Sequence, residues 1–141
     1  MNKIETHVEQ KARHSAEFGE IEGLFFAFSN KQLEEGMIKI GLTMGDVGLI
    51  TSIGMGGYIK KDKVKELNEL FDRQEKERKD RLKDEKALID ALVYELGNHE
   101  YCITYDDRDT LESLGLKKED ISEAVLKKAK KIYLDNQAEV A

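Results

Sequence analysis

The residues best suited to chemistry gather between positions 95 and 112, where a long helical pattern ends and a polar, acidic turn follows. This stretch contains one of the three histidines, His99, and the single cysteine, Cys102. Glu95 and His99 lie one helical turn apart, so both side chains can point to one side. Together with Cys102 and Asp106 they could supply imidazole nitrogen, thiolate and carboxylate, the ligands that zinc takes in a tetrahedral set. The pattern predicts a metal site at Glu95, His99, Cys102 and Asp106, with zinc as the cofactor.

The same residues have other interpretations, which the sequence leaves open. The doubled C-x-x-C pattern and the H-E-x-x-H motif are absent. Cys102 could be a small buried side chain, and His99 a hydrogen-bonding partner at a helix end. A metal with an open coordination position would instead indicate a metal-dependent hydrolase. A nucleophilic Cys102 is disfavoured, because the neighbouring carboxylates oppose a thiolate. His7 and His14 share one face of an expected helix and form a reserve pair of ligands.

The acidic character of this turn supports a different function. Its further carboxylates are opposed locally by Arg108 alone. An acidic patch can dock onto a basic nucleic-acid channel and block it, with fast and salt-sensitive association. The sequence therefore predicts a partner-binding patch at Glu100, Asp107, Asp109 and Glu112.

Composition restricts the class of protein. A chain of 141 residues is expected to form one domain, 1–141. A net charge of −6 and a pI near 5.2 argue against direct nucleic-acid binding, which requires cations to displace counterions. One cysteine cannot form an internal disulfide, and no apolar run reaches membrane-spanning length. The N-terminus is too polar for a signal peptide, so we expect a cytoplasmic protein without a membrane segment.

The elements that must position these residues indicate a mostly helical α+β fold. Strands are expected near 24–28, 49–53 and 57–60 in a small antiparallel sheet, with a glycine-rich turn before the last. Helices are expected over 2–18, with Ile4, Val8 and Ala12 on a thin apolar face, and over 30–40 and 117–136. The absence of proline permits a long helix, or a helical hairpin, over 62–97. Within it, the charged stretch 72–86 fits either a solvated helix or a partner-binding one.

Four segments carry a resemblance to known proteins: FFAFSNKQLEEG, GMGGYI, ELGNHEY and DTLESLG. They resemble a family of small uncharacterised proteins from phages, prophages and mobile elements of Gram-positive bacteria. Some small acidic proteins of such elements are anti-CRISPR proteins, which bind the RNA-guided nuclease of type II systems and stop it loading target DNA. The resemblance implies an inhibitor that acts by protein–protein interaction in the bacterial host, and it carries over no catalytic residues. A zinc ion would then be structural and would pin the turn. A regulatory or structural phage protein without a metal is the third possibility.

Overall fold

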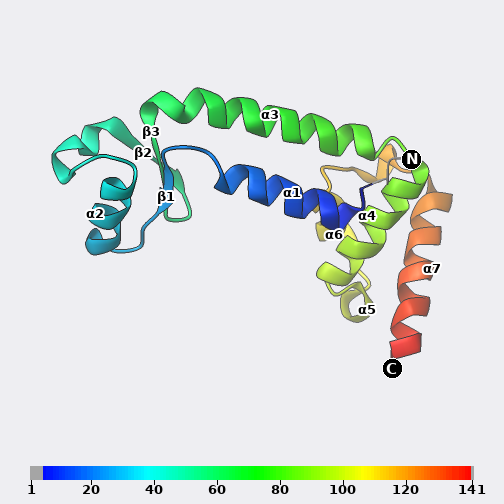
Figure 1. The fold of residues 1–141 in the computed structure, drawn as a ribbon. Coiled ribbons are helices and arrows are strands. Elements are labelled where there is room, and N and C mark those ends of the chain that lie inside the picture. The colour runs from blue at the N-terminus through cyan, green and yellow to red at the C-terminus, as the bar shows by residue number, and fades with distance from the viewer. Residues whose placement is uncertain (1–4, 141) are drawn as a thin grey trace. The chain divides into compact units, whose positions relative to one another are not determined.

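The computed structural model of the protein describes residues 5–140, with side chains through residue 138. It is a mostly helical α+β structure with one small antiparallel sheet, as predicted (Figure 1). In chain order the elements are α1 (His7–Gly19), β1 (Leu24–Phe26), α2 (Asn30–Lys39), η1 (Met44–Leu49), β2 (Ile50–Gly54), β3 (Gly57–Lys60), η2 (Lys61–Lys63), α3 (Val64–Arg81), α4 (Glu85–Asn98), α5 (Tyr101–Thr104), α6 (Arg108–Ser113), η3 (Lys118–Asp120) and α7 (Glu123–Val140).

The chain forms two compact units, and each is described by itself. The helical unit consists of the described residues of 1–12 and 77–141, and the sheet unit consists of residues 13–76. The division falls inside α1 and inside α3. The sheet unit is continuous in sequence, whereas the helical unit is assembled from two separate stretches.

The sheet has the strand order β1-β3-β2, and both pairings are antiparallel. The predicted strands agree with the observed ones to within two residues at each end. Between β2 and β3 the backbone turns through three residues with positive φ, namely Gly54, Met55 and Gly56. Glycine adopts this conformation without steric cost, which explains the glycine-rich sequence of the turn.

The core of the sheet unit lies between β1 and α2. Phe25, Ala27, Met37 and Ile50 form its buried cluster. The N-terminus of α2 is fixed by Ser29, whose Oγ accepts a hydrogen bond from the Gln32 backbone N–H at 3.2 Å. The Gln32 side chain accepts in return from the backbone N–H of Phe28, at 2.8 Å. These reciprocal bonds hold the first turn of α2 in the position that the S-x-x-Q pattern indicates.

Gly36 sets the closeness of α2 to β1, and we expect Gly36→Ala to destabilise the protein by about 1–3 kcal/mol. A Cβ atom at this position would lie 2.2 Å from the Phe25 ring, so the ring or the helix must move. Chemical denaturation would measure the loss of free energy of unfolding. Gly19→Ala is the matched control, because a Cβ atom there meets nothing within 4 Å. Equal stability of the two variants would contradict this packing.

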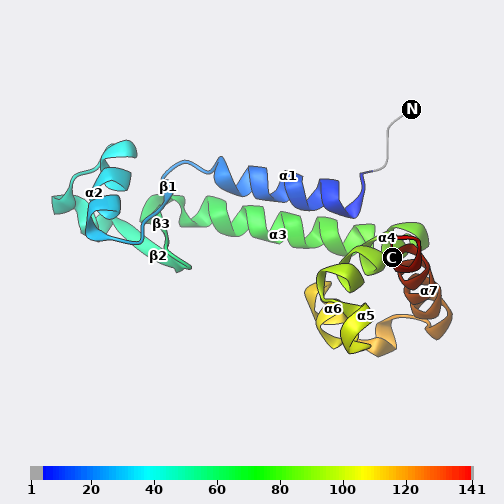
Figure 2. The same cartoon turned by 90° about the horizontal axis from the view of Figure 1, so that it is seen from below.

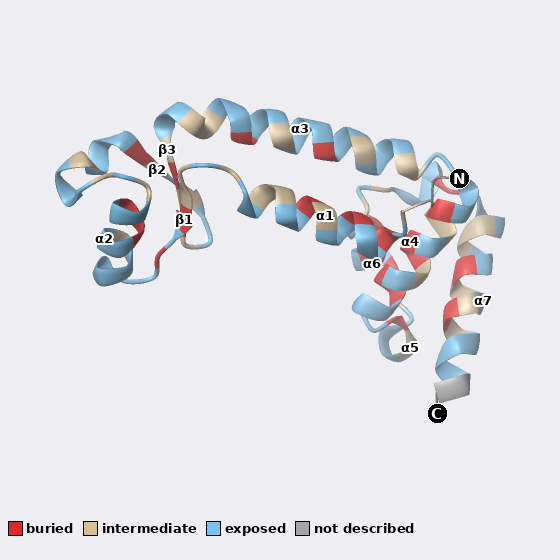
Figure 3. Ribbon diagram, in the orientation of Figure 1, coloured by how far each residue is buried: buried red, intermediate tan, exposed pale blue. Residues whose placement is uncertain are grey.

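The helical unit is organised around α4, which packs against α5, α6 and α7. Figure 3 shows the buried residues along α4 and α7. The N-terminus of α4 is capped by Asp84, whose carboxylate accepts from the Ala87 N–H at 3.0 Å. Burial of its apolar residues supplies most of the stability of this unit. The buried core consists of Leu92, Leu96, Tyr101, Leu111, Ile121, Ala129 and Tyr133.

Of the two alternatives for residues 62–97, one long helix or a helical hairpin, the structure has two helices, α3 and α4, which are separated by residues 82–84. Two expectations about the helices need correction. The predicted apolar face of the first helix is wrong: Val8 and Ala12 are exposed and the buried residues are polar, while Ile4 lies outside the described residues. The last helix begins at Glu123 and not near 117, because Asp120 accepts from the Lys117 N–H and closes a separate short turn.

Candidate functional site

The Glu95 carboxylate of α4 is 2% exposed and has several polar neighbours. Its Oε1 atom lies 2.9 Å from His7 Nε2 and 2.8 Å from Lys11 Nζ. Its Oε2 atom accepts from Asn98 Nδ2 at 3.2 Å, and His99 Nε2 lies 3.4 Å away. We call these five residues the Glu95 network. Both carboxylate oxygens are therefore occupied by neighbours from α1 and from the end of α4.

The network keeps Glu95 ionised. Burial by itself raises the pKa of the Glu95 carboxyl, but the hydrogen bonds from Lys11, His7 and Asn98 outweigh burial and lower the pKa to about 2. A carboxylate that is buried and ionised must have such partners, because an unpaired buried charge is strongly destabilising. The arrangement is consequently well suited to fastening the start of α1 onto α4.

A second contact set holds the start of α1 beside α4. The His7 backbone N–H donates to Asp90 Oδ2 at 2.9 Å, which satisfies one of the unpaired N–H groups of the first helical turn. Arg81 Nη2 binds the same Asp90 oxygen at 2.8 Å. Arg81 also donates to the carbonyl oxygens of Glu5 and Ala87. Its guanidinium thus ties together three segments of the helical unit.

The four predicted zinc ligands are not assembled in this structure. Glu95 and His99 are brought together, but Asp106 pairs with Arg108, whose Nη2 lies 2.6 Å from Asp106 Oδ2. Cys102 packs against the buried core of the helical unit. Among the described residues, no group of three potential ligand side chains includes Cys102 or Asp106. Zinc at these four residues stays a prediction to which the geometry adds no support.

The acidic patch is only partly on the surface. Glu100, Asp109 and Glu112 are exposed, as predicted. Asp107 is buried and lies 2.8 Å from Lys130 Nζ on α7, so its placement in a surface patch is wrong. Asp107 directly precedes α6, and its side chain is buried within the helical unit. A buried carboxylate needs a cationic partner, which Lys130 supplies. Asp107 anchors the turn and does not contribute to its outer surface.

The turn between α4 and α6 has an unusual backbone. The single-turn helix α5 is bracketed by Glu100 and Tyr105, which both have left-handed conformations with φ of 55° and 52°. Residues other than glycine rarely adopt this region, and they do so where the surrounding structure enforces it. In this turn the side chains of Ile103 and Tyr105 are 72% and 67% exposed. Two large side chains therefore stand out among the exposed carboxylates.

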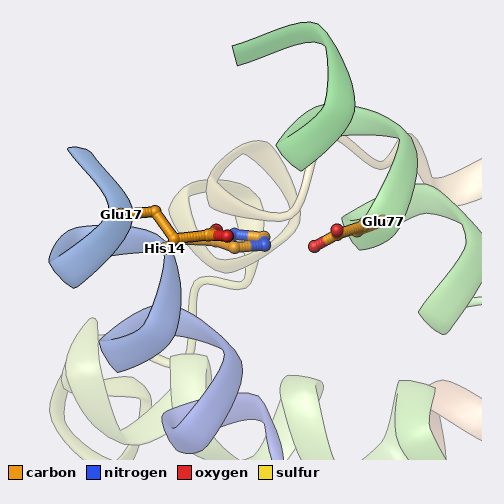
Figure 4. Close-up of side chains that lie close together, drawn as sticks. All are labelled: His14, Glu17 and Glu77. Carbon is orange, nitrogen blue, oxygen red and sulfur yellow. The ribbon is translucent and has the colours of Figure 1, made fainter. Parts of the chain in front are cut away.

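The reserve pair of histidines is divided between the units. His7 belongs to the helical unit and binds Glu95. His14 belongs to the sheet unit, and Figure 4 shows it beside Glu17 on the same helix. Gln74 donates to the His14 carbonyl oxygen at 3.0 Å and to Glu17 Oε1 at 3.2 Å. Within the sheet unit, His14 and Glu17 offer two ligand groups, fewer than the three or four that zinc requires.

Sequence reasoning missed His7 and Lys11 as the partners of Glu95. His7 and Glu95 are 88 positions apart, and no local spacing connects them. One feature of the sequence could have indicated these partners: Glu95 is a charged residue on the apolar face of α4, between buried residues such as Leu92 and Leu96. A charged residue in such a position needs a partner from elsewhere in the chain.

The fold and this site define a small α+β protein in which a buried carboxylate, Glu95, holds the start of α1 against α4. The chain belongs to a protein family of unknown function, DUF7659, which matches residues 6–135. No curated protein and no solved structure matches the chain significantly. Among the described residues, no helix has both the length and the apolar character required to cross a membrane.

Proposed function

We propose that the protein acts by binding and inhibiting a host protein in the bacterial cytoplasm, and that it is not an enzyme. The partner class that we propose is the RNA-guided nuclease of type II CRISPR systems, in line with the resemblance of the sequence to proteins of phages and mobile elements. The contact surface is the outer side of the turn formed by residues 99–112, which we call the acidic turn.

The observation that carries this proposal is the exposure of Ile103 and Tyr105 beside Glu100, Asp109 and Glu112. Interfaces combine a few large anchor side chains with a polar rim, and tyrosine is one of the residues enriched at their energetic centres. The Tyr105 ring also lies against the Tyr101 ring, with a centroid distance of 5.6 Å. A side chain that is already held in place loses less conformational entropy on binding than a mobile one.

The charge of the protein suits this partner. The chain has a net charge of −6, and the exposed acids of the turn give it a local negative surface. A channel that holds nucleic acid is positively charged, so an acidic protein can occupy it and exclude DNA. This mode of binding needs no direct contact between the protein and nucleic acid.

Replacing Ile103 and Tyr105 together by alanine is expected to weaken binding to the nuclease by roughly tenfold or more, because each anchor truncation typically costs more than 1 kcal/mol. Calorimetry and a DNA-cleavage inhibition assay would measure the two effects. Added salt should weaken the wild-type complex as well, because it screens exposed charges. Val8→Ala is the matched control, since Val8 is an exposed apolar residue of the same unit outside the turn.

Two outcomes would oppose the proposal, and they are distinguishable. A nuclease that retains full cleavage at saturating amounts of the protein would refute the choice of partner. Equal binding by the double variant and the control would instead refute the acidic turn as the contact surface. The alternative is a metal-dependent hydrolase at Glu95, His99, Cys102 and Asp106. Of these four residues only Glu95 and His99 are in contact, and Lys11 and Arg108 pair with Glu95 and Asp106.

A further inference from the structure

Lys130 of α7 contacts two separate parts of the acidic turn. Its Nζ atom lies 2.8 Å from Asp107 Oδ2 and 5.2 Å from the centroid of the Tyr101 ring. Tyr101 begins α5, and Asp107 directly precedes α6. Figure 2 shows α5 and α6 together in the helical unit, with α7 across from them. One ammonium group therefore reaches the chain on both sides of Tyr105.

Asp107 depends on this cation because its carboxylate is buried. Asp107 is 6% exposed, and a buried carboxylate that loses its partner is strongly destabilising. A second ammonium group, Lys118 Nζ, lies 3.8 Å from Asp107 Oδ1, but the Lys118 side chain is 70% exposed and water screens its attraction. The Lys130 side chain is 25% exposed and its Nζ atom is closer. Lys130 is accordingly the main partner of Asp107.

The surroundings of Lys130 keep it charged. Burial by itself lowers the pKa of the Lys130 ammonium group, but the contact with the Asp107 carboxylate outweighs burial and raises the pKa above its ordinary value. A charged ammonium group is also what the face of the Tyr101 ring attracts. Both contacts of Lys130 therefore depend on the same positive charge.

Each contact is connected to one side of Tyr105. On the first side, the Tyr101 ring lies 5.6 Å from the Tyr105 ring, centroid to centroid, and the Tyr101 carbonyl oxygen accepts from the Tyr105 N–H at 2.8 Å. On the other side, the Asp107 carbonyl oxygen accepts from the Leu111 N–H at 3.0 Å, the first backbone hydrogen bond of α6. The helix α6 carries two of the exposed carboxylates of the acidic turn.

We propose that Lys130 is the positioning residue of the acidic turn: by holding Tyr101 and Asp107, its ammonium group sets where Tyr105 and the carboxylates of α6 stand. In this role Lys130 acts through its two contacts and does not need to touch the partner. The value of this position for binding rests on the proposed function, whereas the effect of Lys130 on the turn does not.

Hydrogen exchange in the protein without a partner tests the effect on the turn. Lys130→Met keeps a long side chain and removes its charge. It should raise the exchange rates of the Tyr105 and Leu111 amides by roughly tenfold or more, because the residues that accept from them are no longer held. The Leu88 amide of α4, which donates to the Asp84 carbonyl oxygen at 2.9 Å, should keep its rate. An equal rise at all three amides would show a general loss of stability and would overturn the proposal.

Two further variants keep the test independent of folding. Lys130→Met combined with Asp107→Asn removes the buried carboxylate together with its cation, so no unpaired charge is left. Exchange at Leu111 should then return toward the wild-type rate, because the effects of two interacting residues are not additive. Lys128→Met is the matched control, since Lys128 is an exposed lysine of the same helix, and it should leave the exchange rates unchanged. A double variant that exchanges faster at Leu111 than Lys130→Met does would also contradict the proposal.

Calorimetry with the nuclease gives a separate result on function. Lys130→Met should raise the dissociation constant by roughly tenfold, and Lys128→Met should not. A wild-type protein that does not bind would refute the proposed function alone, because the exchange rates decide the role of Lys130 in the turn. Faster exchange of the turn with unchanged binding would instead overturn Lys130 as a positioning residue for the partner.

Discussion

Glu95→Ala is expected to lower the free energy of unfolding by roughly 3 kcal/mol or more, the typical result of removing one partner from a buried ion pair. His7 is buried and would lose its carboxylate partner, whereas Lys11 is half exposed and can regain water. Truncation also removes buried volume beside Leu92 and Leu96. Equilibrium denaturation with urea would measure the loss. Glu95→Gln, which keeps the shape, should be less destabilising.

Glu112→Ala is the matched control for this change. Glu112 belongs to the same unit, lies in helix α6 and is exposed, so its replacement should change the stability by less than about 0.5 kcal/mol. If Glu95→Ala were as stable as Glu112→Ala, the network would not contribute to the fold.

The pH dependence of stability gives an independent measure of the same network. The pKa of Glu95 is lowered from 4.5 to about 2 in the folded protein, so the unfolded chain takes up the proton first as the pH falls. The stabilisation by the ionised carboxylate is fully present above pH 4.5 and is lost as the pH falls toward about 2. The difference in stability between wild type and Glu95→Gln should therefore shrink across this interval.

Tyr133→Ala is expected to destabilise the helical unit by about 3–5 kcal/mol, the range for removal of a large buried aromatic side chain. Tyr133 of α7 packs close to Gly97 of α4 and beside the Tyr101 ring of α5, with a centroid distance of 6.3 Å. Its hydroxyl oxygen accepts from the Cys102 backbone N–H at 3.4 Å. One side chain thus joins the C-terminal helix to the acidic turn. Thermal and urea unfolding would measure the loss.

Tyr133→Phe separates packing from hydrogen bonding. This variant keeps the ring and removes the acceptor, so we expect a loss of about 1 kcal/mol. It should also increase hydrogen exchange at the Cys102 amide, which loses its partner. A loss as large as that of Tyr133→Ala would show that the hydroxyl, and not the ring, holds α7 in place.

The sequence predicted the local structure well for identifiable reasons. The cap at Ser29 and the glycine-rich turn depend on neighbouring residues, whose types determine the backbone conformation. The first helix failed because its buried face is polar: His7 is buried by its contact with Glu95, and the hydrophobic pattern gives no sign of it. An apolar pattern identifies burial against apolar residues and misses burial by ion pairing.

The candidate site shows a similar limit. The spacing of Glu95 and His99 correctly placed their side chains together. Spacing in the sequence shows which side chains can meet, but it does not show which other residues pair with them in the folded protein. Lys11 and Arg108 are such partners, for Glu95 and Asp106 respectively. Both cations occupy carboxylates that the metal prediction required.

The division of the chain has a consequence for its synthesis. Residues 13–76 form a continuous unit, so the ribosome completes the sheet unit early, and domains of nascent chains generally fold as they emerge. His7 and Lys11 leave the ribosome before the sheet unit, yet their carboxylate, Glu95, is made only after the whole sheet unit. We therefore expect the start of α1 to remain unpaired while residues 13–76 are synthesised. The start of α1 is made before the sheet unit but is fixed in place after it.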